Sequence, residues 1–417
     1  MGKNALVSFK GSRQIDTEIT LTGSKSECNR ALIISALSKG LVKVDNMSNA
    51  ADTVTLHHIL NHISSNDPHQ QVVDVGPAGT AMRFLTAYLS ALPGDFLLTG
   101  TERMKQRPIG ILAEALKTLG AELSYAEAEG FPPLLIKGPL HQKTTDVHIK
   151  GDVSSQYISA LLMIAATLNQ GLTLHITDEL TSVPYVKMTL DMLLEAGIEH
   201  TWTGNSIAIK AQNFKPATLV VEPDWSAASY WYSIAALAEV ANISLPYLKE
   251  KSLQGDSRIR EIMIPFGVRT SQTPNGIALK TGTSTTIDEV LNLKDCPDLA
   301  QTIIVCAAAK GLNLSFTGLE TLKIKETDRV KALQNELAKI GVTLTEQNLV
   351  YTLNCDDLCF PEKVSFRTYE DHRMAMAFAP LSLFIKEIEM EDYQVVDKSY
   401  PDYWKDLEKA GFEIREI

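Results

Sequence analysis

Residues 325–329, Lys-Glu-Thr-Asp-Arg, place four ionisable side chains within five positions. An apolar pattern with helical spacing follows at Val330, Leu333, Leu337 and Ile340. A helix N-terminus already carries positive partial charge, so Lys325 and Arg329 cost free energy there unless an anion binds. The segment alone leaves two interpretations open. It is either an anion-binding site or a surface helix whose bases are neutralised by Glu326 and Asp328.

Other polar clusters stand at the starts of strongly apolar segments. Residues 23–30, GSKSECNR, lack the glycine directly before lysine that a nucleotide-binding phosphate loop requires, so we exclude that loop. Arg30 lies beside apolar residues, which predicts a carboxylate or phosphate ligand, although backbone carbonyls are an alternative. Neutral groups that suit a phosphate or a polyol, but also fit ordinary helix capping, stand at Ser154, Ser155, Gln156, Ser182 and Tyr185.

The remaining starts add a glycine, cations and a carboxylate. Gly79 allows a ligand close to the backbone, and residues 103–107 carry three cations that by themselves fit a solvated loop. Asp298 is a lone carboxylate at the head of an apolar segment, and Arg373 stands at the head of another. The pair His58 and His62 has the spacing of a zinc-protease helix but lacks the catalytic Glu, so we interpret it as a solvated helix face and predict no metal site.

These clusters belong to a repeated unit. An amphipathic helix, a glycine and a strand recur, with the glycines spaced 70 to 77 residues apart at Gly120, Gly197, Gly267, Gly341 and Gly411. Apolar helices alternate with them and start near Ser26, Gly79, Ser155, Ser226, Asp298 and His372, the first gap being shortened. Turn signals at residues 204–205 and 275–276 predict hairpins. The pattern predicts an α+β fold of six βαβαββ-like repeats, grouped as two clusters of three.

Composition narrows the class of protein. The chain has 417 residues, is 45% hydrophobic and carries a formal net charge of -11, which predicts a globular protein that does not bind nucleic acid. Its five cysteines lack zinc-site spacing and indicate free thiols in a reducing compartment. Without a membrane-length apolar run or a secretion signal, we expect a soluble, cytoplasmic protein with no membrane partner.

Taken together, the motifs resemble the enolpyruvyl transferases, in particular those that act on shikimate-3-phosphate. The matching stretches, in the order of that family, are GSKSECNRALI, VGPAGTAMRFL, ERMKQRPIG, GDVSSQYISALL, KETDR, EDHRMAMAF and DKSYPDYW. The resemblance implies a two-domain inside-out α/β barrel with three repeats in each domain. Residues 1–24 with 222–417 would form one domain and 25–221 the other, with the active site in the cleft between them.

The resemblance also implies a reaction of the shikimate pathway, which leads to chorismate and the aromatic amino acids. The 5-hydroxyl of shikimate-3-phosphate attacks C2 of phosphoenolpyruvate, C3 gains a proton, and phosphate leaves. By position, the shikimate-3-phosphate ligands are Lys25, Ser26, Arg30, Ser154, Ser155, Gln156, Ser182, Tyr185, Asp298, Thr321 and Lys325. Those of phosphoenolpyruvate are Lys25, Gly79, Arg103, Gln156, Arg329, Arg373 and Lys398. The proton-transfer candidates are Asp298, Glu326 and Lys25.

Charge balance is consistent with this assignment. The two substrates carry about -6 together, against seven cations in the implied site, so we expect those cations to repel one another without ligand. Pro77 and Thr321 replace residues common in the family and put local contacts in doubt. We expect a monomer without a cofactor. The alternatives are a transferase specific for UDP-N-acetylglucosamine, disfavoured because residues 103–110 contain no cysteine, and a non-catalytic anion-binding protein of the same fold.

Overall fold

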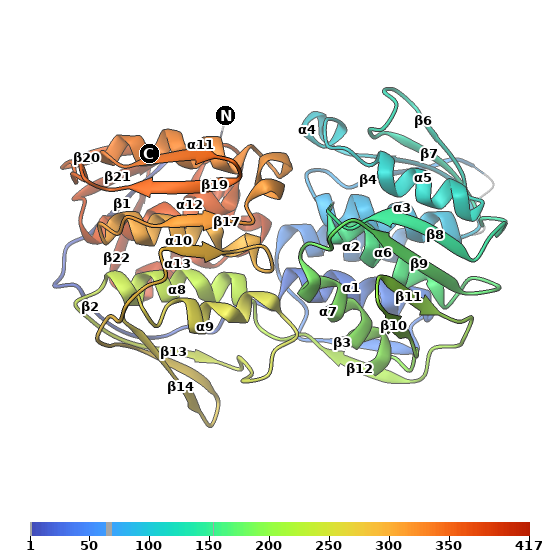
Figure 1. The fold of residues 1–417 in the computed structure, drawn as a ribbon, viewed down its shortest axis with the longest axis horizontal. Coiled ribbons are helices and arrows are strands. Elements are labelled where there is room, and N and C mark those ends of the chain that lie inside the picture. The colour runs from blue at the N-terminus through green and yellow to red at the C-terminus, as the bar shows by residue number, and fades with distance from the viewer. Residues whose placement is uncertain (1, 64–68, 153) are drawn as a thin grey trace. The chain divides into compact units, whose positions relative to one another are not determined.

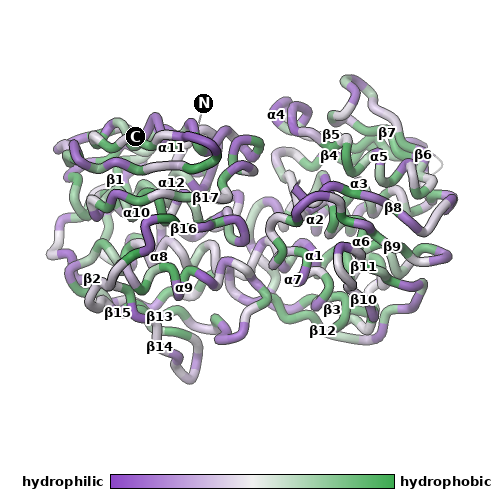
Figure 2. Tube along the Cα trace, viewed as in Figure 1, coloured by the Kyte–Doolittle hydropathy of each residue, from purple (hydrophilic) through white to green (hydrophobic). Residues whose placement is uncertain are grey.

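The computed structural model describes residues 2–63, 69–152 and 154–417. The chain divides into two compact units. Unit 1 comprises Met1–Thr22 and Glu222–Ile417, and unit 2 comprises Gly23–Val221. In Figure 1 the elements of unit 2 run from blue to green, whereas those of unit 1 are the first two strands and the yellow-green to red part of the chain. In each unit many of the connecting loops are hydrophilic (Figure 2).

The described strands of unit 2 form two four-stranded sheets and one two-stranded sheet. They are β3 (Val42–Asp45), β4 (Gln71–Asp74), β5 (Gly94–Thr99), β6 (Glu122–Tyr125), β7 (Leu134–Gly138), β8 (Asp146–Lys150), β9 (Leu172–Thr177), β10 (Thr201–Thr203), β11 (Ser206–Ile209) and β12 (Ala217–Val220). The four-stranded orders are β4-β5-β7-β6 and β10-β11-β9-β8. In the small sheet, β12 pairs parallel with β3.

The described strands of unit 1 form three four-stranded sheets, ordered β14-β15-β13-β2, β16-β17-β19-β18 and β20-β21-β1-β22. Their bounds are β1 (Ala5–Phe9), β2 (Gln14–Glu18), β13 (Val240–Pro246), β14 (Val268–Thr273), β15 (Gly276–Thr281), β16 (Val290–Asn292), β17 (Ser315–Thr317), β18 (Thr343–Gln347), β19 (Val350–Asn354), β20 (Lys363–Phe366), β21 (Glu387–Met390) and β22 (Phe412–Glu416). The first two strands of the chain thus complete sheets built from its C-terminal part.

All five four-stranded sheets share one pattern. In each, an edge strand pairs parallel with its neighbour, as β4 does with β5, and that neighbour pairs antiparallel with one strand of an antiparallel pair. The antiparallel pair is a hairpin in four of these sheets, whereas in the fifth β1 and β22 come from the two ends of the chain. The hairpins predicted at residues 204–205 and 275–276 are present between β10 and β11 and between β14 and β15. The two-stranded sheet is the shortened first repeat. The predicted mixed α+β class is therefore confirmed.

One nearly apolar helix from each repeat lies in the core. In unit 2, α1 (Lys25–Leu37), α3 (Gly79–Ala91) and α6 (Ser155–Ala165) contact one another, and in unit 1, α8 (Trp225–Leu237), α10 (Ala300–Ala309) and α12 (His372–Phe378) do the same. These are the six apolar helices that the sequence predicts. After Phe378 the last of them tightens into the 3-10 segment η5 (Ala379–Leu383), where Pro380 lacks the N–H that an α-helix needs.

Five amphipathic helices flank this core, and the sequence predicts all five. They are α5 (Gly110–Leu119), α7 (Val183–Glu195), α9 (Ile259–Ile262), α11 (Arg329–Leu337) with η4 (Ala338–Ile340), and α13 (Tyr403–Lys409). All five closing glycines have positive φ, between 75° and 112°, as expected of helix C-caps. Only α9 is shorter than predicted, because Pro265 interrupts the segment before Gly267. No helix in the described ranges is long and apolar enough to cross a membrane.

Candidate active site

Arg329 organises the cluster of charged side chains in unit 1. It is the first residue of α11, and its side chain is 2% exposed. Its Nη1 donates to Asp298 Oδ1 at 3.2 Å, its Nη2 to Glu326 Oε2 at 2.9 Å, and its Nε to Asp371 Oδ2 at 2.6 Å. One guanidinium therefore fixes three carboxylates from separate parts of the chain. Their charges raise the pKa of Arg329 far above its usual value despite the opposing effect of burial.

Asp371 has two structural tasks. It is the N-cap of α12, where its Oδ1 accepts a hydrogen bond from the backbone N–H of Arg373 at 2.9 Å. It is also completely buried and accepts the Nε–H of Arg329. The start of α12 and the start of α11 are thus joined through one carboxylate. This links Arg329 and Arg373, two of the five cations assigned to phosphoenolpyruvate.

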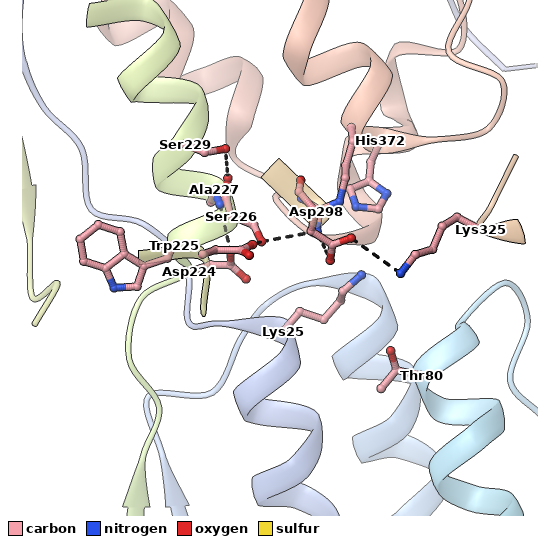
Figure 3. Close-up of polar contacts among 12 residues, drawn as sticks. Lys25, Thr80, Asp224, Trp225, Ser226, Ala227, Ser229, Asp298, Lys325 and His372 are labelled. Atoms are coloured by element: carbon pink, nitrogen blue, oxygen red, sulfur yellow. Dashed lines mark hydrogen bonds and ion pairs between the residues drawn. The ribbon is translucent and has the colours of Figure 1, made fainter. Parts of the chain in front are cut away.

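Asp298 lies between several cations. It is in the 3-10 segment η2 (Pro297–Leu299) before α10, and its Oδ2 accepts a hydrogen bond from Arg373 Nη2 at 2.9 Å. Lys325 Nζ lies 3.9 Å from Asp298 Oδ1, and Figure 3 shows the two side chains facing each other. Burial by itself raises the pKa of Asp298, but the positive charges of Arg373, Lys325 and Arg329 outweigh it and hold that pKa well below its usual range.

Glu326 completes the unit 1 cluster. Besides its bond to Arg329, its Oε1 lies 3.5 Å from Lys398 Nζ, at the end of the 3-10 segment η6 (Tyr393–Lys398). The four predicted site cations of unit 1, Lys325, Arg329, Arg373 and Lys398, are therefore each paired with a carboxylate before any ligand binds. The expected repulsion among the cations does not hold for this unit, because the neighbouring carboxylates Asp298, Glu326 and Asp371 offset their charges.

The stretch 325–329 also differs locally from its predicted form. Helix α11 begins at Arg329, with Asp328 as the N-cap whose side chain accepts a hydrogen bond from Lys331 N–H at 3.0 Å. Lys325 lies before the helix, at the end of the 3-10 segment η3 (Glu320–Ile324), so the predicted crowding of both cations at one helix terminus is wrong. Burial lowers the pKa of Lys325, although the carboxylate of Asp298 opposes this effect.

In unit 2, Arg30 is buried inside α1 and is largely satisfied by the protein. Its Nε donates to Thr189 Oγ1 at 2.7 Å and its Nη1 to the Ser26 carbonyl at 2.8 Å. Its Nη2 donates to Ser159 Oγ at 3.0 Å and to the Tyr185 carbonyl at 3.4 Å. Of the five N–H groups of a guanidinium, one remains for a ligand within the described structure. Burial lowers the pKa of Arg30 to about 10.

The neutral donors of unit 2 gather at the starts of three helices. Ser154 is the N-cap of α6, its Oγ accepting from Gln156 N–H at 3.4 Å, so the capping interpretation holds for it. The amide of Gln156 donates to Thr80 Oγ1 in the first turn of α3 at 3.1 Å. Ser182, before α7, is 7% exposed and has a positive φ of 56° without making a side-chain cap. These contacts join α3 to α6, next to Gly79.

Gly79 is required by its own surroundings. A Cβ at this position would lie 2.5 Å from Arg107 Nη1 and 2.8 Å from Arg83 Nη1, so the two guanidinium groups occupy the space beside the helix start. Arg83 Nη1 also donates to the Gly79 carbonyl at 2.7 Å. Arg103 is exposed in the short helix α4 (Glu102–Lys105) and donates to Gln106 Oε1 at 3.2 Å. Lys25 pairs with the buried carboxylate of Asp52 at 3.3 Å.

Several residues that hold these clusters together are not among the site residues predicted from the sequence. They are Asp52, Arg83, Arg107, Ser159, Thr189, Asp256 and Asp371. Asp371 directly precedes an apolar segment, which is an N-cap signal, but its second role depends on a partner 42 positions away. Thr189 lies in no recognised motif, and Ser159 lies in the stretch GDVSSQYISALL without any role predicted for it. Their role could not be predicted from the sequence, because it consists of accepting hydrogen bonds from Arg30, which is distant along the chain.

The fold resembles that of solved enolpyruvyl transferases. An EPSP synthase from Acinetobacter baumannii superimposes with a TM-score of 0.76 over 99% of both chains at 19% identity. The enolpyruvyl transferase NikO from Streptomyces tendae gives a TM-score of 0.73 at 15% identity, covering 100% of this chain and 99% of the other. At these identities the comparison defines the fold alone, and the fold is that of the enolpyruvyl transferases.

Sequence comparison defines the family within that class. The family described as EPSP synthase (3-phosphoshikimate 1-carboxyvinyltransferase) matches residues 9–407, and the chain belongs to it. A 3-phosphoshikimate 1-carboxyvinyltransferase from Bacteroides fragilis (strain YCH46) is 48% identical over 96% of this chain and 97% of its own length. One from Psychromonas ingrahamii is 34% identical over 94% and 96%. The expectation of an EPSP synthase, a transferase of the shikimate pathway, is thereby confirmed.

Proposed function

We propose that Asp298 and Glu326 carry out the proton transfers by which this enzyme moves the enolpyruvyl group of phosphoenolpyruvate to the 5-hydroxyl of shikimate-3-phosphate. The observation that carries the proposal is that both carboxylates accept hydrogen bonds from the same guanidinium, that of Arg329. Arg329 bonds Asp298 through Nη1 at 3.2 Å and Glu326 through Nη2 at 2.9 Å. Two carboxylates on adjacent nitrogens of one guanidinium can serve the two ends of a single addition reaction.

The roles follow the order of bond changes. Asp298 accepts the proton of the 5-hydroxyl as that oxygen bonds to C2 of phosphoenolpyruvate. Glu326, after taking a proton from solvent and assisted by Lys25, delivers that proton to C3, which yields a tetrahedral intermediate. Return of the C3 proton to the carboxylate accompanies loss of inorganic phosphate and restores the double bond. The proton added to C3 in the first step thus returns to Glu326 in the second. The proton of the 5-hydroxyl, held by Asp298, leaves with phosphate or passes to solvent.

Binding of phosphoenolpyruvate would also activate Asp298. The pKa of this carboxylate is lowered by Arg373, Lys325 and Arg329, which makes it a poor base in the unliganded protein. A phosphate or carboxylate that binds those cations adds negative charge beside Asp298 and competes for the same N–H groups. The pKa of Asp298 then rises towards the range in which it can accept a proton. The cations that restrain the base before binding thus release it when substrate arrives.

The remaining predicted residues are proposed as ligands of the same two substrates. For shikimate-3-phosphate they are Lys25, Ser26, Arg30, Ser154, Ser155, Gln156, Ser182, Tyr185, Thr321 and Lys325, and for phosphoenolpyruvate Lys25, Gly79, Arg103, Gln156, Arg329, Arg373 and Lys398. The Thr321 hydroxyl favours its inclusion, because it is buried and has no hydrogen-bond partner in the described residues. We further propose the inside-out barrel arrangement of three repeats per domain, a monomer, and a cytoplasmic location.

A phosphate-release assay tests the proposed function. Purified protein is given phosphoenolpyruvate with either shikimate-3-phosphate or UDP-N-acetylglucosamine as acceptor. We expect phosphate release only with shikimate-3-phosphate, and with no added metal or cofactor. Release with the nucleotide sugar, or with neither acceptor, would contradict the proposal.

Arg30→Lys is expected to raise the KM for shikimate-3-phosphate by at least about tenfold, because a hydrogen bond to a charged group contributes about 1.5–3 kcal/mol. A lysine has three donors on one nitrogen and cannot reproduce the four bonds that Arg30 makes inside the protein while reaching a ligand. The KM for phosphoenolpyruvate should change much less. Arg13→Lys, in the partly exposed pair with Glu239, is the control. Equal increases in both KM values would contradict the assignment of Arg30 to shikimate-3-phosphate.

A further inference from the structure

Asp256 is a buried carboxylate that is connected to the unit 1 cluster through Ser226. It lies in the 3-10 segment η1 (Gly255–Arg258) and is 3% exposed. Its Oδ2 accepts a hydrogen bond from Ser226 Oγ, in the first turn of α8. Neither residue belongs to the predicted substrate ligands. In Figure 3, Ser226 is drawn next to Asp298.

Ser226 connects Asp256 to Arg373. The Nη2 of Arg373 donates to Asp298 Oδ2 at 2.9 Å and also lies 3.4 Å from Ser226 Oγ. Its Nη1 donates to the Asp298 carbonyl at 3.1 Å and to the Tyr230 hydroxyl at 3.4 Å. The guanidinium is therefore oriented by Asp298 on one side and by the Ser226–Asp256 pair on the other. Any anion that binds Arg373 meets a group whose direction these partners have set.

The charges around Asp256 make its ionisation sensitive to a nearby anion. The groups around it are Asp224 and Ser226 at the start of α8, Cys296 and Asp298 at the start of η2, and Arg373 of α12. Two nearby cations make other contacts: Arg258 Nη1 lies 4.0 Å from Cys296 Sγ, and Arg260 donates to the carbonyls of Ser257 and Glu250. Burial and the charge of Asp298 raise the pKa of Asp256 to about 7, with Arg373 opposing them. A small change in local charge near neutral pH therefore adds or removes a proton.

We propose that the Asp256–Ser226 pair positions Arg373 for the anionic group of phosphoenolpyruvate, and that Asp256 takes up a proton from solvent when this anion binds. The proposal rests on the assignment of Arg373 to phosphoenolpyruvate. The physical reason is charge balance. Asp298, Glu326, Asp371 and Asp256 offset Lys325, Arg329, Arg373 and Lys398, so an incoming anion makes the cluster too negative. Asp256 is assigned no proton transfer, so it can be neutralised without interrupting the reaction.

Two variants separate the two parts of the proposal. Asp256→Asn retains an oxygen that accepts the Ser226 hydrogen bond but mimics the protonated carboxylate. Ser226→Ala keeps the carboxylate and removes the link to Arg373. Glu261→Gln, on the exposed face of the neighbouring α9, is the matched control for removal of one negative charge. All three are compared with the unmodified enzyme from pH 6 to pH 9, with shikimate-3-phosphate saturating.

For the unmodified enzyme and Glu261→Gln, we expect the KM for phosphoenolpyruvate to rise by up to about tenfold per pH unit above pH 7, because one coupled proton must be taken up on binding. Asp256→Asn should lose this pH dependence and show a lower KM than the unmodified enzyme at pH 8.5, with kcat nearly unchanged. Ser226→Ala should raise the KM several-fold at every pH. Calorimetric titration of phosphoenolpyruvate in two buffers of different ionisation enthalpy should detect proton uptake that Asp256→Asn lacks.

A purely structural role for Asp256 predicts the opposite, namely a higher KM and lower thermal stability in Asp256→Asn with the pH profile retained, and that result would overturn the proposal. An unchanged pH profile with unchanged affinity would overturn it as well. Failure of the proposed function is distinguishable. If Arg373 does not bind phosphoenolpyruvate, Arg373→Lys should leave the calorimetric affinity for phosphoenolpyruvate unchanged. This should hold with either Asp or Asn at position 256.

Discussion

Glu326→Gln is expected to lower kcat by about 10² to 10⁴, the usual contribution of a general acid or base, while shikimate-3-phosphate still binds. The amide has nearly the same shape and can still accept a hydrogen bond from Arg329 Nη2, which the carboxylate accepts at 2.9 Å. It cannot carry the proton that C3 must gain and then lose. Stopped-flow turnover together with equilibrium binding of shikimate-3-phosphate measures the two quantities separately.

The matched control for this prediction is Glu320→Gln. Glu320 is exposed in η3, six positions before Glu326, and the change removes the same charge without touching Arg329. Its kcat should remain within about twofold of the unmodified enzyme, since surface substitutions have small effects. Turnover near normal in Glu326→Gln would remove this carboxylate from the mechanism. Loss of shikimate-3-phosphate binding in the same variant would assign it to substrate binding instead.

The fold was predictable because its signals are local and repeated. A glycine such as Gly197 or Gly341 closes a helix through its own positive φ, which depends on neighbouring residues only. The apolar helices are predicted to be buried because they are apolar on all faces. In α8, Trp225 and Trp231 are completely buried. Exceptions arise where proline acts inside a segment, as Pro265 does in shortening α9.

The site was predictable only in part because charge pairing is a property of three-dimensional contacts. The residues with motifs, Arg329 and Arg373 among them, were identified from position along the chain. Their pairing with carboxylates was not, since Asp371 meets Arg329 across 42 positions, and Asp298, itself identified from the sequence, meets Arg373 across 75. Counting cations from motifs alone therefore gave an excess of positive charge that the folded unit does not have. Carboxylates that neutralise a site carry weaker sequence signals than the bases they hold.

Arg329→Met is expected to lower the free energy of unfolding by about 3–5 kcal/mol, the cost of removing one partner from a buried ion pair. Because methionine fills much of the volume of the arginine side chain, the loss of unfolding free energy should be mainly electrostatic. Asp371 is completely buried and would lose the Nε–H donor that it accepts at 2.6 Å, leaving a charge in the core with only the α12 backbone N–H of Arg373 and weaker partners. Urea denaturation, monitored by the fluorescence of the tryptophans in unit 1, measures the change.

Arg367→Met is the control for this stability prediction. Arg367 pairs with Glu391 at 3.3 Å, but the two side chains are 62% and 41% exposed, so the loss should be below about 1 kcal/mol. The double variant Arg329→Met with Asp371→Asn should recover part of the lost stability, because it no longer buries an unpaired charge. A loss below 1 kcal/mol in Arg329→Met, or further destabilisation in the double variant, would mean that the carboxylates around Arg329 are stabilised by other groups. Because unit 1 holds all three carboxylates on one guanidinium, we expect the loss to exceed that of Arg367→Met severalfold.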